Sequence, residues 1–374
     1  MVKVVTWNVG GMYSDPRKRA AIFAELKKMR CDIALLQETH CPCMDTADEW
    51  QREWGGLAFF TDYSSSCDGA AILFKPGFSP SFQRTDLDPR GQFVRTVFSW
   101  ESIDWTIVSV YVPNEVSRRK AFLRNVLPGL LVGQNLVVGG DFNCVLNTVL
   151  DVDSKNREPS AGAGRDLLVK AMQDTGTHDA YRTLHPTTRM YTRTGWGRQS
   201  PARLDRHLVS DSILPMVGAV KKRVSGLSDH DPVLMTIDSG NGLAHGPGYW
   251  KMNVTLMDEE GCSGFKLLWH RWKQCKNTHT GGVDGWCAEG LAKAAEFFQQ
   301  LGESRAAAER RREKEARQRV ELLDRLLSKQ DNTSWQKEAY QKGLHTAKTY
   351  LRERDLHRPC GGSPDEVQGE AGFF

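Results

Sequence analysis

Five polar residues stand at the ends of apolar runs that predict β-strands, where a strand terminus does not require them. They are Asn8 after VVTW, Glu38 after IALLQ, Asp141 and Asn143 in LVVGGDFN, and Asp205 in ARLDRHL. Each one alone has a structural explanation, as a turn residue, an exposed acid or the partner of a neighbouring arginine. As a set they need a further explanation, because carboxylates that converge at strand ends repel one another unless a cation neutralises them. The set predicts a site for Mg²⁺, with Mn²⁺ as a substitute, held by oxygen ligands and completed by water and substrate phosphate.

A second polar cluster, the run SDHD at residues 228–231, precedes the apolar run 232–237. A turn at a strand entrance needs only one polar residue to satisfy a backbone donor. The run is therefore richer than a turn requires, although ordinary turn chemistry is the alternative to a functional role. We assign Asp231 to turn or helix-rim chemistry.

The elements that must position these residues alternate between strand and helix. A β-α-β unit is expected over residues 2–9, 17–30 and 31–39, because the first and last runs are apolar and the middle one has helical periodicity. So many strands with few helices favour two packed sheets covered by helices over a single doubly wound sheet. Further strands are predicted at 69–75, 92–100, 104–113, 135–142, 203–210 and 232–238, and helices at 117–127 and 164–176.

Composition limits the classes of protein. The chain has 374 residues, 40% of them hydrophobic, a formal net charge of +4 and nine cysteines. No apolar run approaches the roughly 18 residues of a membrane span, and the start has no signal-peptide pattern, so we expect no membrane partner. The odd cysteine count without zinc-like spacing favours reduced thiols. Because the charge divides almost evenly along the chain, attraction to a nucleic acid must come from local patches.

The residue composition of the sequence changes after Asp238. We expect a domain over residues 1–238, a Gly-rich linker at 239–249 and a mostly helical region at 250–374, where Glu, Arg, Ala and Leu dominate. Apolar residues at helical spacing within 301–330 predict a long helix with exposed ion pairs. This helix could mediate self-association, or it could await a missing partner.

Six motifs carry a resemblance: TWNVGG, LLQETH, YVPN, GGDFN, RLDRHLVS and SDHDP. In this order they resemble the endonuclease/exonuclease/phosphatase superfamily over residues 2–238. The resemblance implies a four-layered α/β sandwich. Within that superfamily the chain most resembles the apurinic/apyrimidinic-type endonuclease domain of LINE-type non-LTR retrotransposons, related to exonuclease III. The helical region resembles the connector that leads toward a reverse transcriptase in such elements, and no YxDD motif is present.

The resemblance also implies roles for individual residues. Glu38 with Asn8 would hold the divalent metal, Asp141 would orient or deprotonate the attacking water, and Asn143 and Tyr111 would contact the scissile phosphate. The implied metal-site residues are Asn8, Glu38, Asp141, Asn143, Asp229 and His230.

The histidine motif has roles of its own in the family. His230 would contact the phosphate while Asp229 orients its ring. Asp205 would assist metal binding or charge balance near the histidine, and Ser228 would brace the loop.

The loop before Asp205 bears on the substrate. Residues 187–205 interleave arginines with tyrosine and tryptophan, a pattern suited to phosphate contacts and to a flat side chain in a groove. A solvated hairpin is the alternative. The predicted DNA-binding residues are Arg193, Trp196, Arg198, Arg203 and Ser228.

These features lead to an expected Mg²⁺-dependent endonuclease that nicks double-stranded DNA, leaving 3′-hydroxyl and 5′-phosphate ends, and that derives from a retrotransposon. An abasic-site or exonuclease III-type repair enzyme and a phosphatase of the same fold are the alternatives, since catalytic residues alone do not select the substrate. A non-catalytic DNA-binding protein is a third reading, which the complete residue set disfavours. Nuclear residence is expected from the substrate, with the cytoplasm as the alternative.

Overall fold

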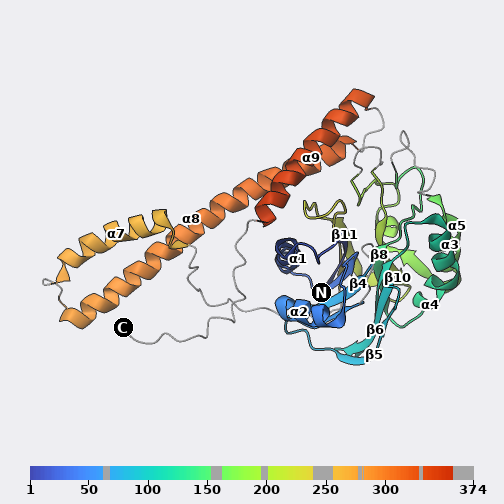
Figure 1. The fold of residues 1–374 in the computed structure, drawn as a ribbon, viewed down its shortest axis with the longest axis horizontal. Coiled ribbons are helices and arrows are strands. Elements are labelled where there is room, and N and C mark those ends of the chain that lie inside the picture. Colours follow the sequence, from blue (N-terminus) through green and yellow to red (C-terminus); the bar gives the residue numbers. More distant parts are fainter. Residues whose placement is uncertain are drawn as a thin grey trace. The chain divides into compact units, whose positions relative to one another are not determined.

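The computed structural model describes residues 1–61, 68–152, 162–194, 201–238, 256–276, 280, 282–327 and 332–356. These residues form two compact units, coloured along the chain in Figure 1. The first combines the described residues of 1–238 with 320–327 and 332–356, and the second contains the described residues of 256–319. All of the polar strand-end residues belong to the first unit. The expected linker at 239–249 lies outside the described residues.

Two six-stranded sheets form the centre of the first unit. Both are mixed: β1 pairs parallel with β2 and antiparallel with β12, and β8 pairs parallel with β7 and antiparallel with β10. Sheet one has the order β11 (Val217–Lys222), β12 (Val233–Ile237), β1 (Val2–Asn8), β2 (Ile33–Gln37), β4 (Ala70–Phe74), β3 (Ala58–Phe60). Sheet two has the order β5 (Ser81–Leu87), β6 (Phe93–Trp100), β7 (Ile103–Tyr111), β8 (Leu136–Asp141), β10 (Asp205–Ser210), β9 (Thr177–Asp179).

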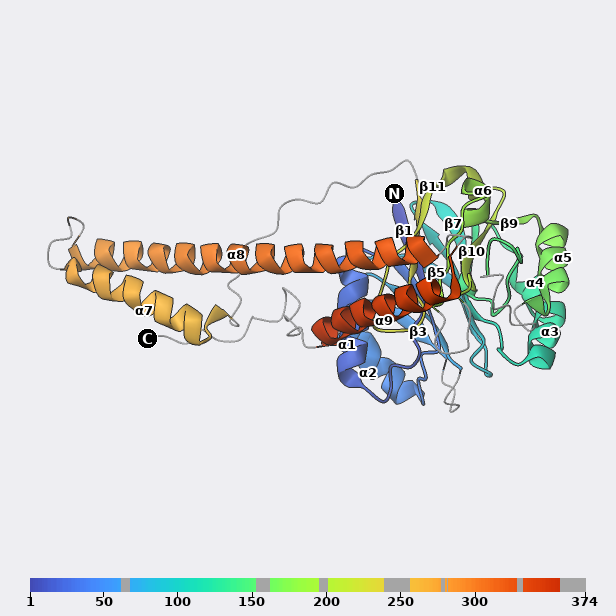
Figure 2. The ribbon, with the colours of Figure 1, turned by 90° about the horizontal axis from the view of Figure 1, so that it is seen from above.

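Helices cover the outer face of each sheet, which gives four layers (Figure 2). Sheet one carries α1 (Pro16–Lys28) and α2 (Met44–Trp54). Alternate residues of β1 face opposite ways, so Val4 packs between the sheets while Trp7 packs with the helices. Sheet two carries α3 (Val116–Asn125), α4 (Leu127–Leu130) and α5 (Arg165–Thr175), and the short α6 (Ala180–Leu184) follows β9. The predicted four-layered sandwich is confirmed.

Several elements of the first unit were not predicted from the sequence. Most of them lack the periodicity that marks the other strands and helices; α2 is the exception, because its buried Ala47, Trp50 and Trp54 recur at helical spacing. Strand β5 is largely exposed and β11 reads VGAVKK, so neither forms an apolar run. The unpredicted elements are β3, β5, β9, β11, α2, α4 and α6, and the 3₁₀ turn Leu214–Met216.

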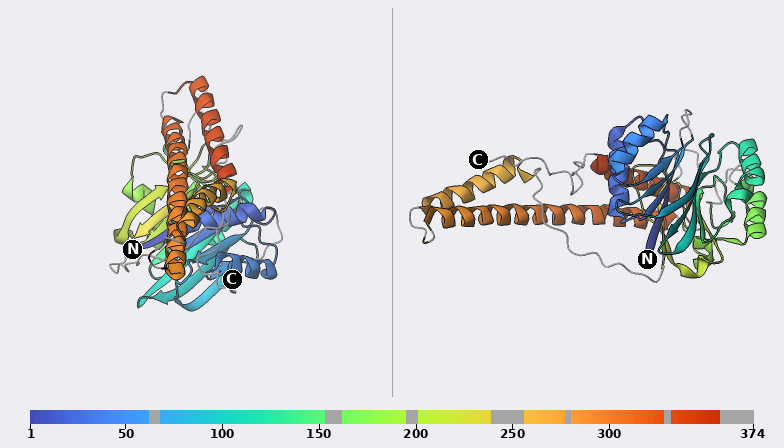
Figure 3. Two further views of the ribbon diagram at one scale, coloured as in Figure 1. Left: turned by 90° about the vertical axis from the view of Figure 1, so that its left-hand side faces the viewer. Right: turned by 90° about the horizontal axis from the view of Figure 1, so that it is seen from below.

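The predicted C-terminal helical region consists of α7 (Glu259–Gln274), α8 (Gly282–Leu327) and α9 (Ser334–Leu356). Figure 3 shows α8 as one continuous helix. In the second unit α7 packs on α8 through aromatic rings, including Trp272 stacked on Trp286 with ring centroids 6.1 Å apart. No helix in the described part of the chain is long and apolar enough to cross a membrane.

The domain boundary expected at residue 238 does not separate the compact units, because α9 packs in the first unit. Leu344 and Leu351 of α9 are buried, and Leu356 packs against the apolar core beneath α1. The end of α8 belongs to the same unit, where Val320 and Leu327 are buried within the chain itself. These two apolar positions are therefore occupied by intrachain packing rather than left for self-association.

Candidate active site

Strand register brings the polar strand-end residues to one edge of the sandwich. In sheet one, Asn8 ends β1 and Glu38 follows the end of the neighbouring parallel strand β2. In sheet two, Asp141 lies between two neighbours, opposite Tyr111 of β7 and Asp205 of β10. The two sheets thus contribute oxygen-bearing side chains to a common site, as the sequence predicted.

The amide of Asn8 joins two of the carboxylates. Its Nδ2 donates to Glu38 Oε1 at 2.9 Å and to Asp141 Oδ2 at 3.0 Å. Its Oδ1 accepts a hydrogen bond from the backbone N–H of Gly10 at 3.0 Å, which fixes which end of the amide faces the acids. One neutral side chain therefore orients an acid from each sheet toward the same point.

The backbone at the site adopts an uncommon conformation. Glu38 and Asn143 have φ values of 51° and 47°, in the left-handed region that non-glycine residues rarely occupy. The turn at Asn143 lets its backbone N–H donate to Asp141 Oδ1 at 2.8 Å, while its side-chain Nδ2 donates to the carbonyl of Val112 at 2.9 Å. Both oxygens of Asp141 are thus hydrogen-bonded. Such conformations persist where the surrounding structure enforces them and are frequent at active sites.

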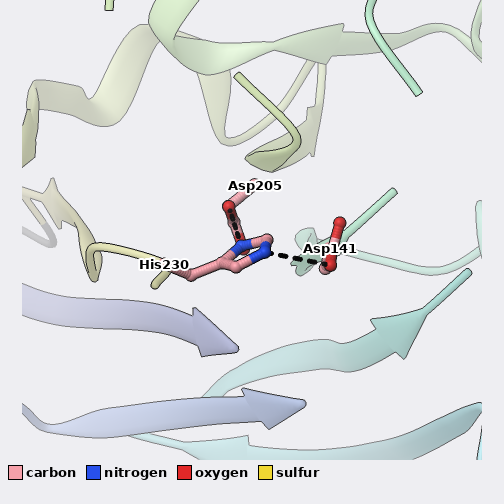
Figure 4. A group of neighbouring side chains, drawn as sticks. All are labelled: Asp141, Asp205 and His230. Carbon is pink, nitrogen blue, oxygen red and sulfur yellow. Dashed lines mark hydrogen bonds and ion pairs between the residues drawn. The ribbon is translucent and has the colours of Figure 1, made fainter. Parts of the chain in front are cut away.

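His230 lies between two aspartates (Figure 4). Its Nδ1 is 2.8 Å from Asp205 Oδ2, and its Nε2 is 3.9 Å from Asp141 Oδ2. The backbone of the histidine is also held, because Trp7 Nε1 donates to its carbonyl at 3.0 Å and its N–H donates to Ser228 Oγ at 3.2 Å. Ser228 thereby occupies the position of a loop brace. The imidazole is fixed at both ring and backbone.

The prediction that Asp229 orients the histidine ring is wrong. Asp229 is exposed, and its carboxylate accepts a hydrogen bond from Ser228 Oγ at 3.4 Å rather than from the ring. The residue at Nδ1 is Asp205, which is fully buried. Asp229 therefore does not join the oxygen atoms gathered around Asp141.

The charges at the site are poorly balanced without a further cation. Burial raises the pKa of both Glu38 and Asp141, because the ionised forms are desolvated. Burial also raises the pKa of Tyr111, whose hydroxyl shares a hydrogen bond with Glu38. For His230, burial alone would lower the pKa, but the adjacent carboxylates of Asp205 and Asp141 outweigh it and raise the value to about 10. The histidine is thus cationic at neutral pH.

These residues fit a divalent cation. Ligand atoms of Asp141, Asp205 and His230 lie within 4.8 Å of one another, and Asp205 Oδ1 is buried without a hydrogen-bond partner. A protonated imidazole competes with a metal, so the oxygen pair of Glu38 and Asp141 is the better position for a hard cation. A cation there would supply the positive charge that the desolvated carboxylates lack.

Only some of the predicted DNA-binding residues can be placed. Trp196 and Arg198 lie outside the described residues. Arg193 is half-buried, and its backbone pairs with Ala202 and forms a bridge to His230. The predicted hairpin therefore touches the histidine loop directly.

The prediction that Arg203 contacts DNA is wrong. Its side chain is fully buried, and its guanidinium is paired with Asp151 at 2.9 Å and with Asp179 at 2.7 Å. Neither acid is near Arg203 in the sequence. Arg203 therefore neutralises buried carboxylates and cannot reach a nucleic acid.

Thr192 is a site residue that the sequence did not reveal. Its Oγ1 accepts hydrogen bonds from the backbone N–H groups of Leu204 at 3.0 Å and Asp205 at 3.1 Å. Its carbonyl accepts from the N–H of Asp231 at 2.7 Å. One buried threonine thus connects the strand that carries Asp205 to the loop that carries His230. Nothing in the sequence distinguishes it from other hairpin threonines.

Comparison with known families assigns the chain. The model of the Endonuclease/Exonuclease/phosphatase family matches residues 5–230. The chain belongs to this family. The resemblance drawn from its six motifs is confirmed, and with it an enzyme of the nuclease and phosphodiesterase class, which requires a metal.

A similar curated protein is the Transposon TX1 uncharacterized 149 kDa protein of Xenopus laevis, 24% identical over 280 residues. The match covers 73% of this chain, and the chain spans 21% of the length of that relative. The matched region of this chain thus corresponds to a small part of a much larger transposon protein.

Solved structures share the fold. An AP endonuclease from Archaeoglobus fulgidus superposes with a TM-score of 0.53 at 20% identity, over 64% of this chain and all of that one. The 3′-5′ exonuclease NExo from Neisseria meningitidis gives a TM-score of 0.53 at 21% identity, over 63% of this chain and 100% of its own. At these identities the likeness concerns the fold.

Proposed function

We propose that the chain is a Mg²⁺-dependent DNA endonuclease of retrotransposon origin, which nicks double-stranded DNA to leave 3′-hydroxyl and 5′-phosphate ends. The observation that carries this proposal is the opposition of two groups. On one side Asn8 holds the carboxylates of Glu38 and Asp141, and on the other Asp205 holds a cationic His230. The transposon protein among the relatives supports the origin.

The residues divide the work of hydrolysis. The carboxylate of Asp141 orients the attacking water and accepts its proton, since both its oxygens are fixed and the group faces the site. The water oxygen attacks phosphorus, the bond from phosphorus to the 3′-oxygen breaks, and the departing oxygen takes a proton from solvent to become the 3′-hydroxyl. The imidazolium of His230 stabilises the negative charge that grows on the phosphoryl oxygens. Tyr111 and Asn143 lie beside Asp141, where the phosphate must bind.

Glu38 and Asp141, with Asn8 between them, would hold the Mg²⁺. When bound, this cation supplies polarisation of the phosphoryl group and charge stabilisation of the leaving oxygen. Asp205 contributes through His230, whose ring tautomer and charge it fixes.

A repair enzyme that cuts at abasic sites is the second candidate. It is favoured by the fold likeness to AP endonucleases and by a Neisseria 3′ phosphatase, NExo, solved bound to a product DNA hairpin at 20% identity. A phosphatase acting on smaller substrates would use the same residues. A nuclear location follows from a DNA substrate and belongs to the same proposal.

Nicking of supercoiled plasmid tests the proposal. We expect open circles to form with Mg²⁺ but not with EDTA, and not with His230→Ala under either condition. A polymerase should extend the nick directly, because the product carries a 3′-hydroxyl. Cutting confined to a duplex with one abasic site would establish the repair enzyme instead. Failure to cut either DNA would refute the endonuclease.

A further inference from the structure

A partly buried cluster of four charges links the C-terminal helices to the histidine loop, residues 223–232 between β11 and β12. We call Lys222, Asp231, Asp324 and Lys348 the four-charge cluster. Lys348 Nζ of α9 lies 2.8 Å from Asp231 Oδ1, and Lys222 Nζ lies 3.4 Å from Asp231 Oδ2 and 2.7 Å from Asp324 Oδ2 near the end of α8. The side chain of Lys348 is 7% exposed and that of Asp231 only 1%. Asp231, which the sequence assigned to turn chemistry, is therefore an anchor point.

Lys348 reaches both neighbours of the catalytic histidine. It binds Asp231 directly, and it donates to Thr194 Oγ1 at 2.6 Å. Thr194 in turn binds the carbonyl of Asp229 through its N–H at 3.0 Å and its hydroxyl at 3.2 Å. His230 stands between the two residues that this lysine secures.

Gly226 of the histidine loop has a backbone conformation that other residues also adopt, but the space that a side chain would need is filled. A Cβ at Gly226 would lie 2.2 Å from the carbonyl oxygen of Lys348 and 2.6 Å from the backbone N of Arg352. Distances this short exclude any side chain unless the helix moves. The loop and the backbone of α9 are thus fitted to each other independently of the charges.

We propose that Lys348 is a positioning residue for His230, and that α9 is an integral part of the endonuclease rather than of a connector. Without the lysine, Asp231 keeps one cation at the longer distance, and the carbonyl of Asp229 loses the group that holds Thr194. The loop then relaxes toward water and carries the ring away from Asp141. A displacement of about 1 Å in a catalytic group can cost about 100-fold in rate. This inference rests on the proposed function.

Steady-state nicking by the full chain tests the inference, with Lys348→Met compared against Lys342→Met. Lys342 is the matched control because it lies exposed on the same helix. We expect Lys348→Met to lower kcat by about 10- to 100-fold and to leave KM for DNA within about twofold, since the buried lysine cannot contact DNA. Lys348→Arg, which keeps the charge and the donors, should restore most of kcat. Assays run well below the melting temperature of every variant.

A second measurement does not depend on activity. In protein labelled with ¹⁵N-histidine, the ring signals of His230 can be assigned by their loss in His230→Gln. We expect them to move in Lys348→Met and to stay in place in Lys342→Met. If wild-type protein fails to nick DNA, the proposed function falls, yet these spectra still decide whether Lys348 positions the ring.

Gly226→Ala provides a variant that removes no charge and pushes on α9 at Lys348 and Arg352. It should lower kcat and move the His230 signals, and it replaces Lys348→Met if that variant does not fold. Wild-type kcat together with unmoved His230 signals in Lys348→Met or Gly226→Ala would overturn the inference. A rise in KM at constant kcat would also overturn it, because it would make Lys348 a DNA contact.

Discussion

Replacing Arg203 tests whether this arginine stabilises the fold or binds DNA. Its guanidinium makes four hydrogen bonds, at 2.9 and 3.2 Å to Asp151 and at 3.1 and 2.7 Å to Asp179. Both acids are buried, and although burial would raise the pKa of Asp179, Arg203 holds it below its usual range. Arg203→Met keeps most of the side-chain volume and removes the cation. It leaves Asp179 buried with no ion pair and Asp151 with Arg182 at 2.6 Å.

The magnitude follows from the burial. Breaking a buried ion pair by removing one partner costs about 3–5 kcal/mol, because the remaining charge is desolvated and unpaired. A folded domain is stable by only about 5–15 kcal/mol in total. For a unit of this size, about 2–4 °C of melting temperature is lost per kcal/mol. We therefore expect Arg203→Met to melt roughly 6–20 °C below wild type.

Thermal denaturation and DNA binding together give the test. At a temperature where the variant is folded, the logarithm of its DNA affinity should depend on salt as in wild type, since a buried arginine neutralises no phosphate. Arg193→Met is the comparison on the same hairpin. If Arg193 does bind a phosphate, losing it reduces the salt slope by about 0.9. Unchanged melting of Arg203→Met with a reduced salt slope would refute the burial argument.

Three further outcomes are expected. Glu38→Gln should lower metal-dependent nicking by at least about 100-fold. In EDTA at pH 7 the same variant should melt at a higher temperature than wild type, because burial raises the pKa of this carboxyl and its ionised form destabilises the fold. A lower melting temperature would contradict the charge argument. Asp205→Asn should reduce kcat by about 10²- to 10⁴-fold with little change in DNA affinity, because the ring loses the carboxylate charge that fixes its tautomer and its protonation. Single-turnover nicking measures this, and a wild-type rate would remove Asp205 from the mechanism. His207 is buried with a pKa lowered to about 3 by desolvation, so its neutral form is favoured in the fold. The unfolded chain binds the proton below about pH 6.5, so the unfolding free energy of wild type should fall by about 2 kcal/mol from this group between pH 7 and pH 5. Urea denaturation of His207→Leu should lack that loss. An equal dependence of unfolding free energy on pH in both proteins would show that the group titrates normally.

The sequence revealed β1, β2 and β8, which position Asn8, Glu38 and Asp141, because these strands are buried and largely apolar. It misassigned the partner of His230 because residues adjacent in a bent loop need not face the same way. Asp229 is exposed while His230 is buried. The residue at the ring is Asp205, which lies 25 positions earlier in strand β10 of sheet two. Adjacency along the chain was the wrong guide to proximity.

The same limit explains Arg203 and Lys348. An arginine in a basic, aromatic hairpin has the composition of a DNA contact, and only the fold brings Asp151 and Asp179 against it. A lysine in a charged helix far beyond the catalytic motifs has the composition of a solvated surface, and only the fold buries it against Asp231. Ion pairs between distant segments leave no periodic signal in the sequence.

The ion-pair partners of the buried acids distinguish the acids of the active site from the others. In the described part of the chain, buried carboxylates are paired with a permanent cation in nearly every case, as Glu25 is with Arg223 and Asp231 is with Lys348. Asp141 and Asp205 are the two that have no lysine or arginine within ion-pair distance, and they share one histidine. The carboxylate of Asp205 is paired with His230 at 2.8 Å, whereas that of Asp141 lies 3.9 Å from the same ring and contacts the amide of Asn8. This difference supports the proposal that Glu38 and Asp141 hold the metal while Asp205 holds His230.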